Sequence, residues 1–116
     1  MLSIKNKKKA KRRSIHLRIR KRIKGTVDRP RLSVYKTNRA IYAQLIDDDR
    51  GHTVLSGNSL QLKGKSIKHA IQMAEDLAKR ALAKNITQVV FDRSGYPYHG
   101  VIKEFSKSAS QNGLKH

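Results

Sequence analysis

The chain has 116 residues, with 27 Lys and Arg against eight Asp and Glu, and a formal net charge of +19 at pH 7. That length suits one domain with a short extension, and the charge favours a polyanionic partner such as nucleic acid. The absence of cysteine excludes disulfides, thiolate zinc sites and a cysteine nucleophile, and no apolar run approaches the roughly 20 residues of a membrane span.

The first 24 residues form a basic arm, since half of them are Lys or Arg and no carboxylate precedes Asp28. Such a segment repels itself, so we expect residues 1–25 to be disordered or helical when free and ordered when bound. Ile15, Ile19 and Ile23 recur every four residues and predict one narrow apolar stripe on a helix. That helix would be about 30 Å long and would project well beyond a core of about 13 Å radius.

The arm does not resemble an export or membrane signal. Charged residues interrupt its apolar positions, so it lacks the apolar centre of a signal peptide. One isoleucine stripe is also too narrow for a membrane-active amphipathic helix. We therefore expect a soluble, cytoplasmic protein.

Residues 26–116 are expected to form a single domain that begins with three strands. Alternating apolar and polar side chains, separated by turn residues, predict these strands over 31–36, 40–46 and 53–57. Leu32 and Val34 share one face of the first strand.

A helix, a strand and a second helix follow. Ser66 is a candidate N-cap for a helix over 66–84, and Asn85 a candidate stop. An apolar strand over 86–91, buried on both sides if central, and a helix over 100–112 that ends at Asn112-Gly113 complete the domain. The residues expected to face inward from the helices are Ile67, Ile71, Ala74, Leu77, Ala78, Ala81, Leu82, Val101, Ile102, Phe105 and Ala109.

The order of these elements predicts an α/β (α+β) fold. Hairpin-linked strands alternate in direction, and the 66–84 helix allows a right-handed crossover to a strand parallel to its neighbour. We predict a small mixed sheet of four strands in the order 3-2-1-4, covered by two helices.

Two short patterns have a catalytic and an ordinary interpretation. Gly64-Lys65-Ser66 resembles the end of a phosphate-binding loop. Such a loop needs a glycine five residues before Gly64, but that position is Ser59, so an ordinary helix start is the better account. Asp47, Asp48 and Asp49, with Asp92, would be the carboxylates of a metal-dependent nuclease. Consecutive loop residues diverge, however, so we expect the acidic loop to solvate the hairpin tip and Asp92 to pair with Arg93. The five His residues lack metal-ligand spacing.

The segment VVFDRSGYPYHG (89–100) follows the fourth strand, where sites of open α/β sheets tend to lie. Its cation, hydroxyl and rings suit phosphate contact and stacking of Tyr96 and Tyr98 on unpaired bases. A tight structural turn with rings packed on the core explains the same residues equally well.

Cations and an amide also gather around the first predicted strand. They are either a solvated basic edge that blocks edge-to-edge pairing or a continuation of the arm into one nucleic-acid-facing surface. The adjoining arm favours the second interpretation.

These motifs together resemble a known family. The segments RPRLSVYKTNRAIYAQLIDD (29–48) and 89–100, the closing NGLK (112–115) and a basic arm of matching length resemble the bacterial form of ribosomal protein eighteen of the large subunit, the 5S rRNA-binding family. The resemblance covers essentially the whole chain. It implies a sheet related to that of ribonuclease H, without catalytic carboxylates.

The resemblance also implies a function. It implies a structural constituent of the large ribosomal subunit that binds 5S rRNA and helps attach it to 23S rRNA in the central protuberance, beside neighbouring ribosomal proteins. No catalysis, small-molecule substrate, membrane, cofactor or protein-held metal is implied, and any Mg²⁺ would be held by the RNA. The location would be the ribosome of the cytoplasm, with a plastid ribosome as the alternative, and a small metal-dependent nuclease of ribonuclease-H-like fold is the rival function.

The candidate RNA-binding residues come from the arm, the first strand and the 89–100 segment. They are Lys7, Lys8, Lys9, Lys11, Arg12, Arg13, Arg18, Arg20, Lys21, Arg22, Arg29, Arg31, Lys36, Asn38, Arg39, Arg93, Ser94, Tyr98 and His99. Two positions depart from the family's usual residues. Val101 replaces an Arg, which removes one expected phosphate contact, and His116 replaces a terminal Phe, which would loosen the packing of the C-terminus.

Overall fold

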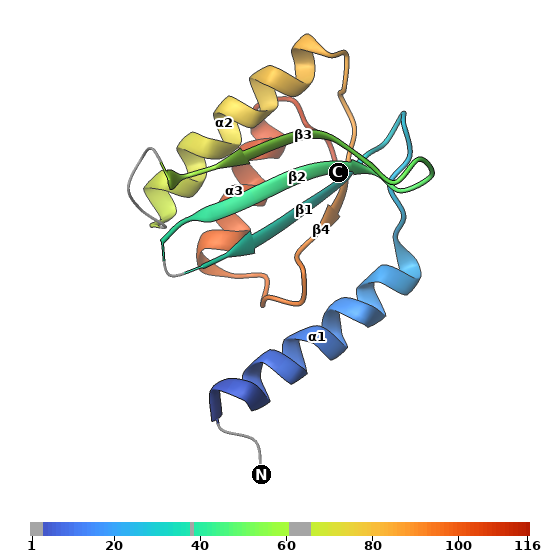
Figure 1. Ribbon diagram of the computed structural model, residues 1–116. Helices are drawn as coiled ribbons and strands as arrows, with labels where there is room; N and C mark the ends of the chain where they lie inside the picture. Colours follow the sequence, from blue (N-terminus) through green and yellow to red (C-terminus); the bar gives the residue numbers. More distant parts are fainter. Residues whose placement is uncertain (1–3, 38, 61–65) are drawn as a thin grey trace.

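A computed structural model describes residues 4–37, 39–60 and 66–116. Asn38 and the Gly64-Lys65 pair of the phosphate-loop pattern lie outside the described residues. The elements are, in chain order, α1 (Ile4–Arg22), β1 (Arg31–Lys36), β2 (Ile41–Asp47), β3 (His52–Asn58), α2 (Ile67–Ala83), β4 (Val90–Asp92) and α3 (Gly100–Gln111) (Figure 1).

The four strands form one mixed sheet in the order β3-β2-β1-β4, which confirms the predicted order. β1 and β2 are antiparallel and place Tyr35 opposite Tyr42. β4 is parallel to β1 and places Asp92 beside Ser33. Tight turns can join only antiparallel neighbours, whereas α2 carries the chain to the parallel strand.

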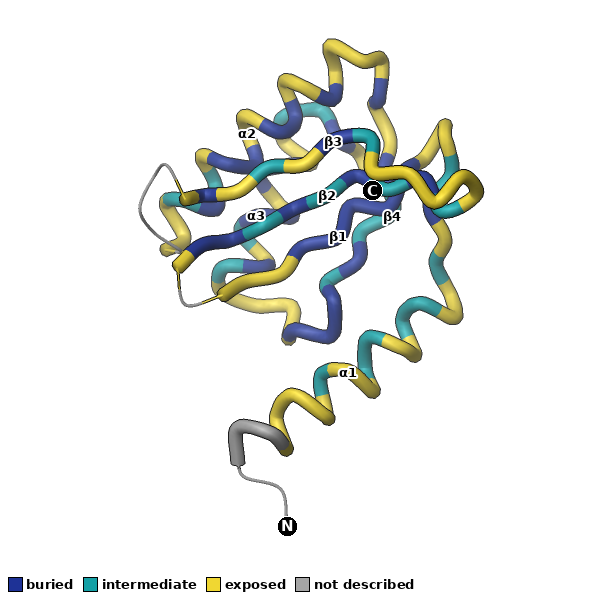
Figure 2. Tube along the Cα trace, in the orientation of Figure 1, coloured by how far each residue is buried: buried dark blue, intermediate teal, exposed yellow. Residues whose placement is uncertain are grey.

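One face of the sheet carries the core, and α2 and α3 cover it (Figures 1 and 2). The buried side chains on this face include Leu32 and Val34 of β1 and Leu45 of β2, which pack with Leu77 of α2 and Phe105 of α3. Since side chains alternate along a strand, the intervening residues face the opposite side. We call that side the open face.

The fourth strand is shorter than predicted and lies at the edge of the sheet. Residues before it pair with the C-terminal segment instead, because the Val89 amide donates to the Lys115 carbonyl at 2.9 Å and the Lys115 amide donates to the Thr87 carbonyl at 3.1 Å. Val90 then donates to Pro30 at 2.9 Å and enters the sheet. The predicted strand is therefore divided between two partners, and Val90 and Phe91 are only half-buried.

The ends of α2 agree with the prediction, but two of its predicted core positions do not. Ser66 is the N-cap, and Asn85 has a φ of 64° just beyond the last turn. Ile67 and Leu82 are 45% and 39% exposed. The face that contacts the sheet consists of Ala70, Met73, Ala74, Leu77, Ala78 and Ala81, and Ile67 and Leu82 lie at its margins.

Most of the arm forms the helix α1. Its half-buried positions follow one side of α1 and include the predicted stripe of Ile15, Ile19 and Ile23. The prediction that α1 projects away from the domain is wrong for most of its length. Its second half contacts the domain, because Arg12 faces Gly95, His16 binds Asp92 and Arg20 binds Asp48. Figure 1 shows the helix below the sheet, on the β4 side.

Candidate nucleic-acid interface

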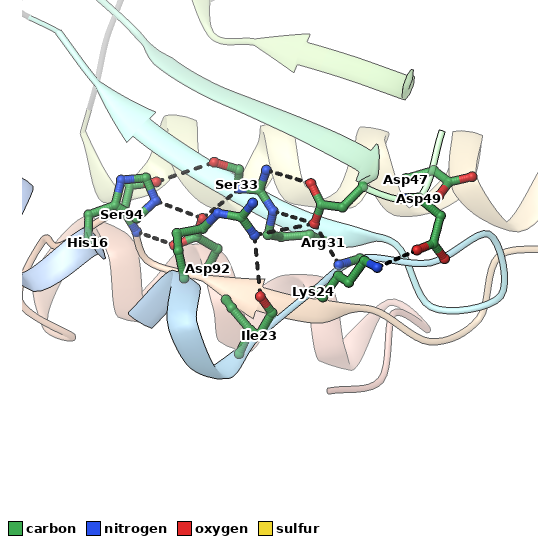
Figure 3. Close-up of polar contacts among 12 residues, drawn as sticks. His16, Ile23, Lys24, Arg31, Ser33, Asp47, Asp49, Asp92 and Ser94 are labelled. Carbon is green, nitrogen blue, oxygen red and sulfur yellow. Dashed lines mark hydrogen bonds and ion pairs between the residues drawn. The ribbon is translucent and has the colours of Figure 1, made fainter. Parts of the chain in front are cut away.

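Two carboxylates connect the arm to the domain through a single arginine. Arg31 donates to both carboxylate oxygens of Asp48, from Nε at 3.0 Å and Nη2 at 3.1 Å, and from Nη1 to Asp92 at 2.7 Å. His16 of α1 donates from Nε2 to Asp92 at 2.9 Å, and Arg20 donates to Asp48 at 3.3 Å. We call these five residues the carboxylate hub, of which Figure 3 labels His16, Arg31 and Asp92.

The domain residues of the hub are largely buried, whereas the side chains that α1 contributes, His16 and Arg20, are 35% and 33% exposed. Arg31 is 8% exposed and Asp92 is fully buried. Burial alone would lower the pKa of Arg31, but its hydrogen bonds and charge interactions with Asp48 and Asp92 outweigh burial and raise that pKa. The hydrogen bond from Arg31, the Gly25 amide and the nearby cations together hold the pKa of Asp48 at about 2, against an ordinary value of 3.8. A bidentate arginine–carboxylate pair of this kind fixes orientation as well as charge.

Two glycines let α1 and the segment that follows it approach the domain closely. A Cβ at Gly25 would overlap the Ile46 carbonyl oxygen and lie 2.5 Å from the Arg31 amide nitrogen. Gly95, with a φ of +82°, faces the Arg12 backbone so closely that a Cβ there would overlap the Arg12 carbonyl. Backbone contact at two separated points, together with the hub, defines the direction of the helix relative to the sheet.

A cationic groove of about 740 Å³ lies between α1 and β1. Four cations, three hydroxyls and three rings line it, and none of these described residues is acidic. They are Lys8, Lys9, Arg12, Lys36, Ser33, Thr37, Ser94, His16, Tyr35 and Tyr96. Side chains of this kind suit phosphate groups, ribose hydroxyls and bases.

Tyr96 is a structural member of this groove. The ring is only 7% exposed, and its hydroxyl donates to the Lys36 carbonyl at 3.1 Å. The Arg12 guanidinium lies 4.6 Å and the Lys36 amine 5.5 Å from the centre of the ring. For Tyr96 the structural-turn interpretation is therefore correct, because cations already cover the ring that we considered for base stacking.

A second cationic hollow lies elsewhere along α1. Arg18, Lys21 and Arg22 line it with Arg93, around a volume of about 340 Å³. Arg93 is held there because its guanidinium donates to the Tyr96 carbonyl at 2.6 Å. The structure thus brings a residue of the 89–100 segment together with the arm.

The candidates around β1 do not form one cluster. Arg29 precedes the strand and Arg39 follows it, so they lie at opposite ends of a strand about 17 Å long. Both are exposed, whereas Arg31 lies in the hub between them. Among the described candidates of this group, Lys36 alone lines the groove.

The candidates of the 89–100 segment also separate. Ser94 is nearly buried, and its hydroxyl lies 3.3 Å from that of Ser33 at the base of the groove. Tyr98 is 51% exposed and donates to Ser106 at 3.1 Å, while its ring contacts the edge of Phe91. His99 is exposed at the start of α3. Neither Tyr98 nor His99 lines the groove.

The C-terminal residue packs against the domain, contrary to our expectation. The ring of His116 stacks on Phe91 at 5.3 Å, and its Nε2 lies 2.7 Å from the Ser106 hydroxyl. An imidazole here makes the aromatic contact expected of a phenylalanine and adds a hydrogen bond.

The acidic residues are structural, which corrects two predictions. Asp47 is 2% exposed and Asp48 belongs to the hub, so the loop does not simply solvate the hairpin tip. Asp92 pairs with Arg31 and His16 and not with Arg93. Of the carboxylates of the rival nuclease hypothesis, Asp48 and Asp92 pair with Arg31, Asp49 pairs with Lys24 and Asp47 pairs with Arg50. The described residues include no cluster of His, Asp or Glu suited to a metal ion.

Sequence reasoning missed the hub and a pair of tyrosines on the open face. The residues that pair with Arg31 or with its carboxylates come from α1 and from the ends of β2 and β4. They are far apart in the sequence, so no local sequence pattern predicts the hub. The pair could have been found, because a short turn after Lys36 places Tyr35 opposite Tyr42 on the side away from Leu32 and Val34.

Comparison with known proteins places the chain in a family. The profile described as ribosomal L18 of archaea, bacteria, mitochondria and chloroplasts matches residues 5–116. The chain is 54% identical to large ribosomal subunit protein uL18 of Mycoplasma mycoides, over 90% of the chain and 92% of the relative. It is 52% identical to uL18 of Dictyoglomus turgidum over 97% and 98%, and 49% identical to uL18 of Limosilactobacillus reuteri over 99% of both.

None of the helices in the described ranges is long and apolar enough to span a membrane. The relatives are ribosomal proteins and not enzymes, in agreement with paired carboxylates and a basic groove. The chain belongs to the ribosomal L18 family, the uL18 proteins of the large ribosomal subunit.

Proposed function

We propose that the protein binds 5S rRNA and helps attach it to 23S rRNA in the central protuberance of the large subunit. The observation that carries this proposal is the docking of α1 by the carboxylate hub. Docking places the cations of the arm beside those of the domain, so that both belong to one basic surface.

The arrangement separates affinity from positioning. Exposed cations of α1 neutralise phosphates and release counterions, which supplies most of the affinity. The groove, with its fixed hydroxyls and rings, supplies shape and hydrogen bonds. Arg31 and Ser94 act from within the domain, Arg31 by orienting α1 and Ser94 by closing the base of the groove.

Two cationic hollows along α1 fit a protein that joins two RNA segments. One contains Lys8, Arg12 and Lys36, and the other contains Arg22 and Arg93. A helix between two negatively charged strands would screen their mutual repulsion. Mg²⁺ enters this proposal only as an ion held by the RNA.

Equilibrium binding of the whole chain to 5S rRNA and to transfer RNA, at the same moderate salt, tests the proposal. We expect 5S rRNA to bind at least tenfold more tightly, because shape and base contacts add to a shared phosphate contribution. Equal affinity for the two RNAs would reduce the protein to a general polyanion binder and contradict the proposal.

A further inference from the structure

Two tyrosines form a stacked pair on the open face of the sheet. The rings of Tyr35 and Tyr42 lie 4.9 Å apart with an angle of 6° between their planes. They are direct partners across β1 and β2, so the backbone register holds them together. Tyr35 remains 40% exposed.

Cross-strand packing explains why the Tyr35 and Tyr42 rings stack, but it does not explain why Tyr35 also lies at the groove. An aromatic pair of this kind stabilises a sheet through contact between the side chains of neighbouring strands. Tyr35, however, also lines the cationic groove, whereas Tyr42 does not. The pair therefore presents a supported aromatic ring to a hollow whose other walls carry Lys8, Arg12 and Lys36.

The charge around this ring is unbalanced toward the cations. In the sheet register, Asp92 of β4 lies beside Ser33, two residues before Tyr35 on β1. Its carboxylate already binds Arg31 and His16. The Arg12 guanidinium lies on the face of Tyr96, and in such a stacked geometry the N–H groups at its edge can donate to a phosphate. The groove thus joins an exposed ring to several cations in a space of about 740 Å³, which is within the size range of small-ligand pockets.

We infer that this groove holds an unpaired nucleotide of the bound RNA, with its base stacked on Tyr35 and its phosphate held by Arg12 and Lys36. The inference rests on the proposed RNA-binding function and specifies what the groove takes. Only an unpaired base can stack on the ring, because both faces of a base within a duplex are covered by its neighbours. Tyr42 acts as a positioning residue, because its ring stacks on one face of Tyr35 and holds that ring in place.

Photo-crosslinking to 5S rRNA that contains 5-iodouridine tests the contact directly. Illumination should form an adduct on the peptide that contains Tyr35, and Tyr35→Phe should retain it because stacking needs no hydroxyl. Tyr35→Leu should lose it. Adducts that form elsewhere while the Tyr35 peptide stays unmodified would overturn the inference.

Affinity measurements separate this inference from the proposed function. For a single-stranded RNA, Tyr35→Leu should weaken binding about tenfold relative to Tyr35→Phe, while binding to a duplex of the same length should change less than twofold. If the wild type binds both RNAs and Tyr35→Leu weakens neither, or both equally, stacking is wrong and RNA binding stands. If the wild type binds no RNA, both proposals fail. Equal thermal unfolding of the two variants shows that they share the native fold.

Discussion

Arg31 shows how a basic residue can serve RNA binding from inside a domain. It spans the gap between Asp48 and Asp92, and each carboxylate also receives a hydrogen bond from α1. Breaking a buried charge pair leaves the remaining charges uncompensated, which costs more than losing an exposed pair. The hub therefore links the stability of the domain to the direction of the arm.

Replacing Arg31 should destabilise the protein far more than replacing an exposed neighbour. We expect Arg31→Ala to lower the free energy of unfolding by about 3 kcal/mol, because two carboxylates lose their shared partner. Arg39→Ala removes the same charge from an exposed turn and should change it by less than about 0.5 kcal/mol. Urea unfolding at neutral pH measures both, and equal values would show that the hub contributes no stability.

The lowered pKa of Asp48 predicts a specific loss of stability in acid. Because this pKa is about 2 in the folded chain and 3.8 ordinarily, the ionised carboxylate stabilises the fold above about pH 4. That contribution, on the order of 1–2 kcal/mol, disappears as the pH falls from about 4 to 2. Asp48→Asn should lack this part of the acid transition.

Asp76→Asn is the matched control for Asp48→Asn, because the Asp76 side chain is 70% exposed and lies 3.8 Å from Arg80. Its stability should follow the wild type between pH 4 and 2. The hub would have no role in acid stability if Asp48→Asn and Asp76→Asn gave the same curve.

At the scale of elements, α1 is held mainly by polar contacts and by one narrow isoleucine stripe. His16→Ala with Arg20→Ala removes both of its hub contacts but keeps good helix-forming residues. We expect the amide hydrogens of α1 to exchange about tenfold faster in this variant, while those of β1 and β2 do not change.

The matched control for that exchange experiment changes the solvent side of the same helix. Arg13→Ala with Leu17→Ala alters two exposed positions of α1, so its exchange should stay close to that of the wild type. Equal acceleration in both variants would mean that helix propensity, and not docking, determines the exchange.

How far the elements could be predicted depends on how local their causes are. Strand alternation and the cap at Ser66 are local, so the order β3-β2-β1-β4 and the start of α2 were predictable. The length of β4 was not, because Val89 pairs with Lys115 from the end of the chain. The exposure of Leu82, at the edge of the buried face of α2, was also not predictable, because it depends on the angle at which the helix packs on the sheet.

The candidate site was predictable in part for the same reason. Charge density alone identified the arm, and the motif of 89–100 identified Arg93. Sequence reasoning treats charged residues as exposed, so it misplaced Arg31 and missed its pairing with Asp48 and Asp92, which depends on the register of three strands.

At the scale of the whole molecule, the two faces of the sheet differ in function. The face under α2 and α3 (Figure 2) holds the apolar core. The groove beside α1 and the tyrosine pair belong to the other side. Cations on α2 and α3 therefore lie across the sheet from the proposed RNA surface. The side on which a cation lies should decide whether it contributes to binding.

The salt dependence of 5S rRNA affinity tests this central claim most directly. Lys8→Gln, Lys9→Gln and Lys36→Gln, combined in one chain, remove three exposed cations from the groove. Lys79→Gln, Lys103→Gln and Lys107→Gln remove three exposed cations from α2 and α3. We predict that the groove variant lowers the slope of log affinity against log salt by about two to three, while the helix variant keeps the wild-type slope. Equal slopes for the two variants would contradict the account.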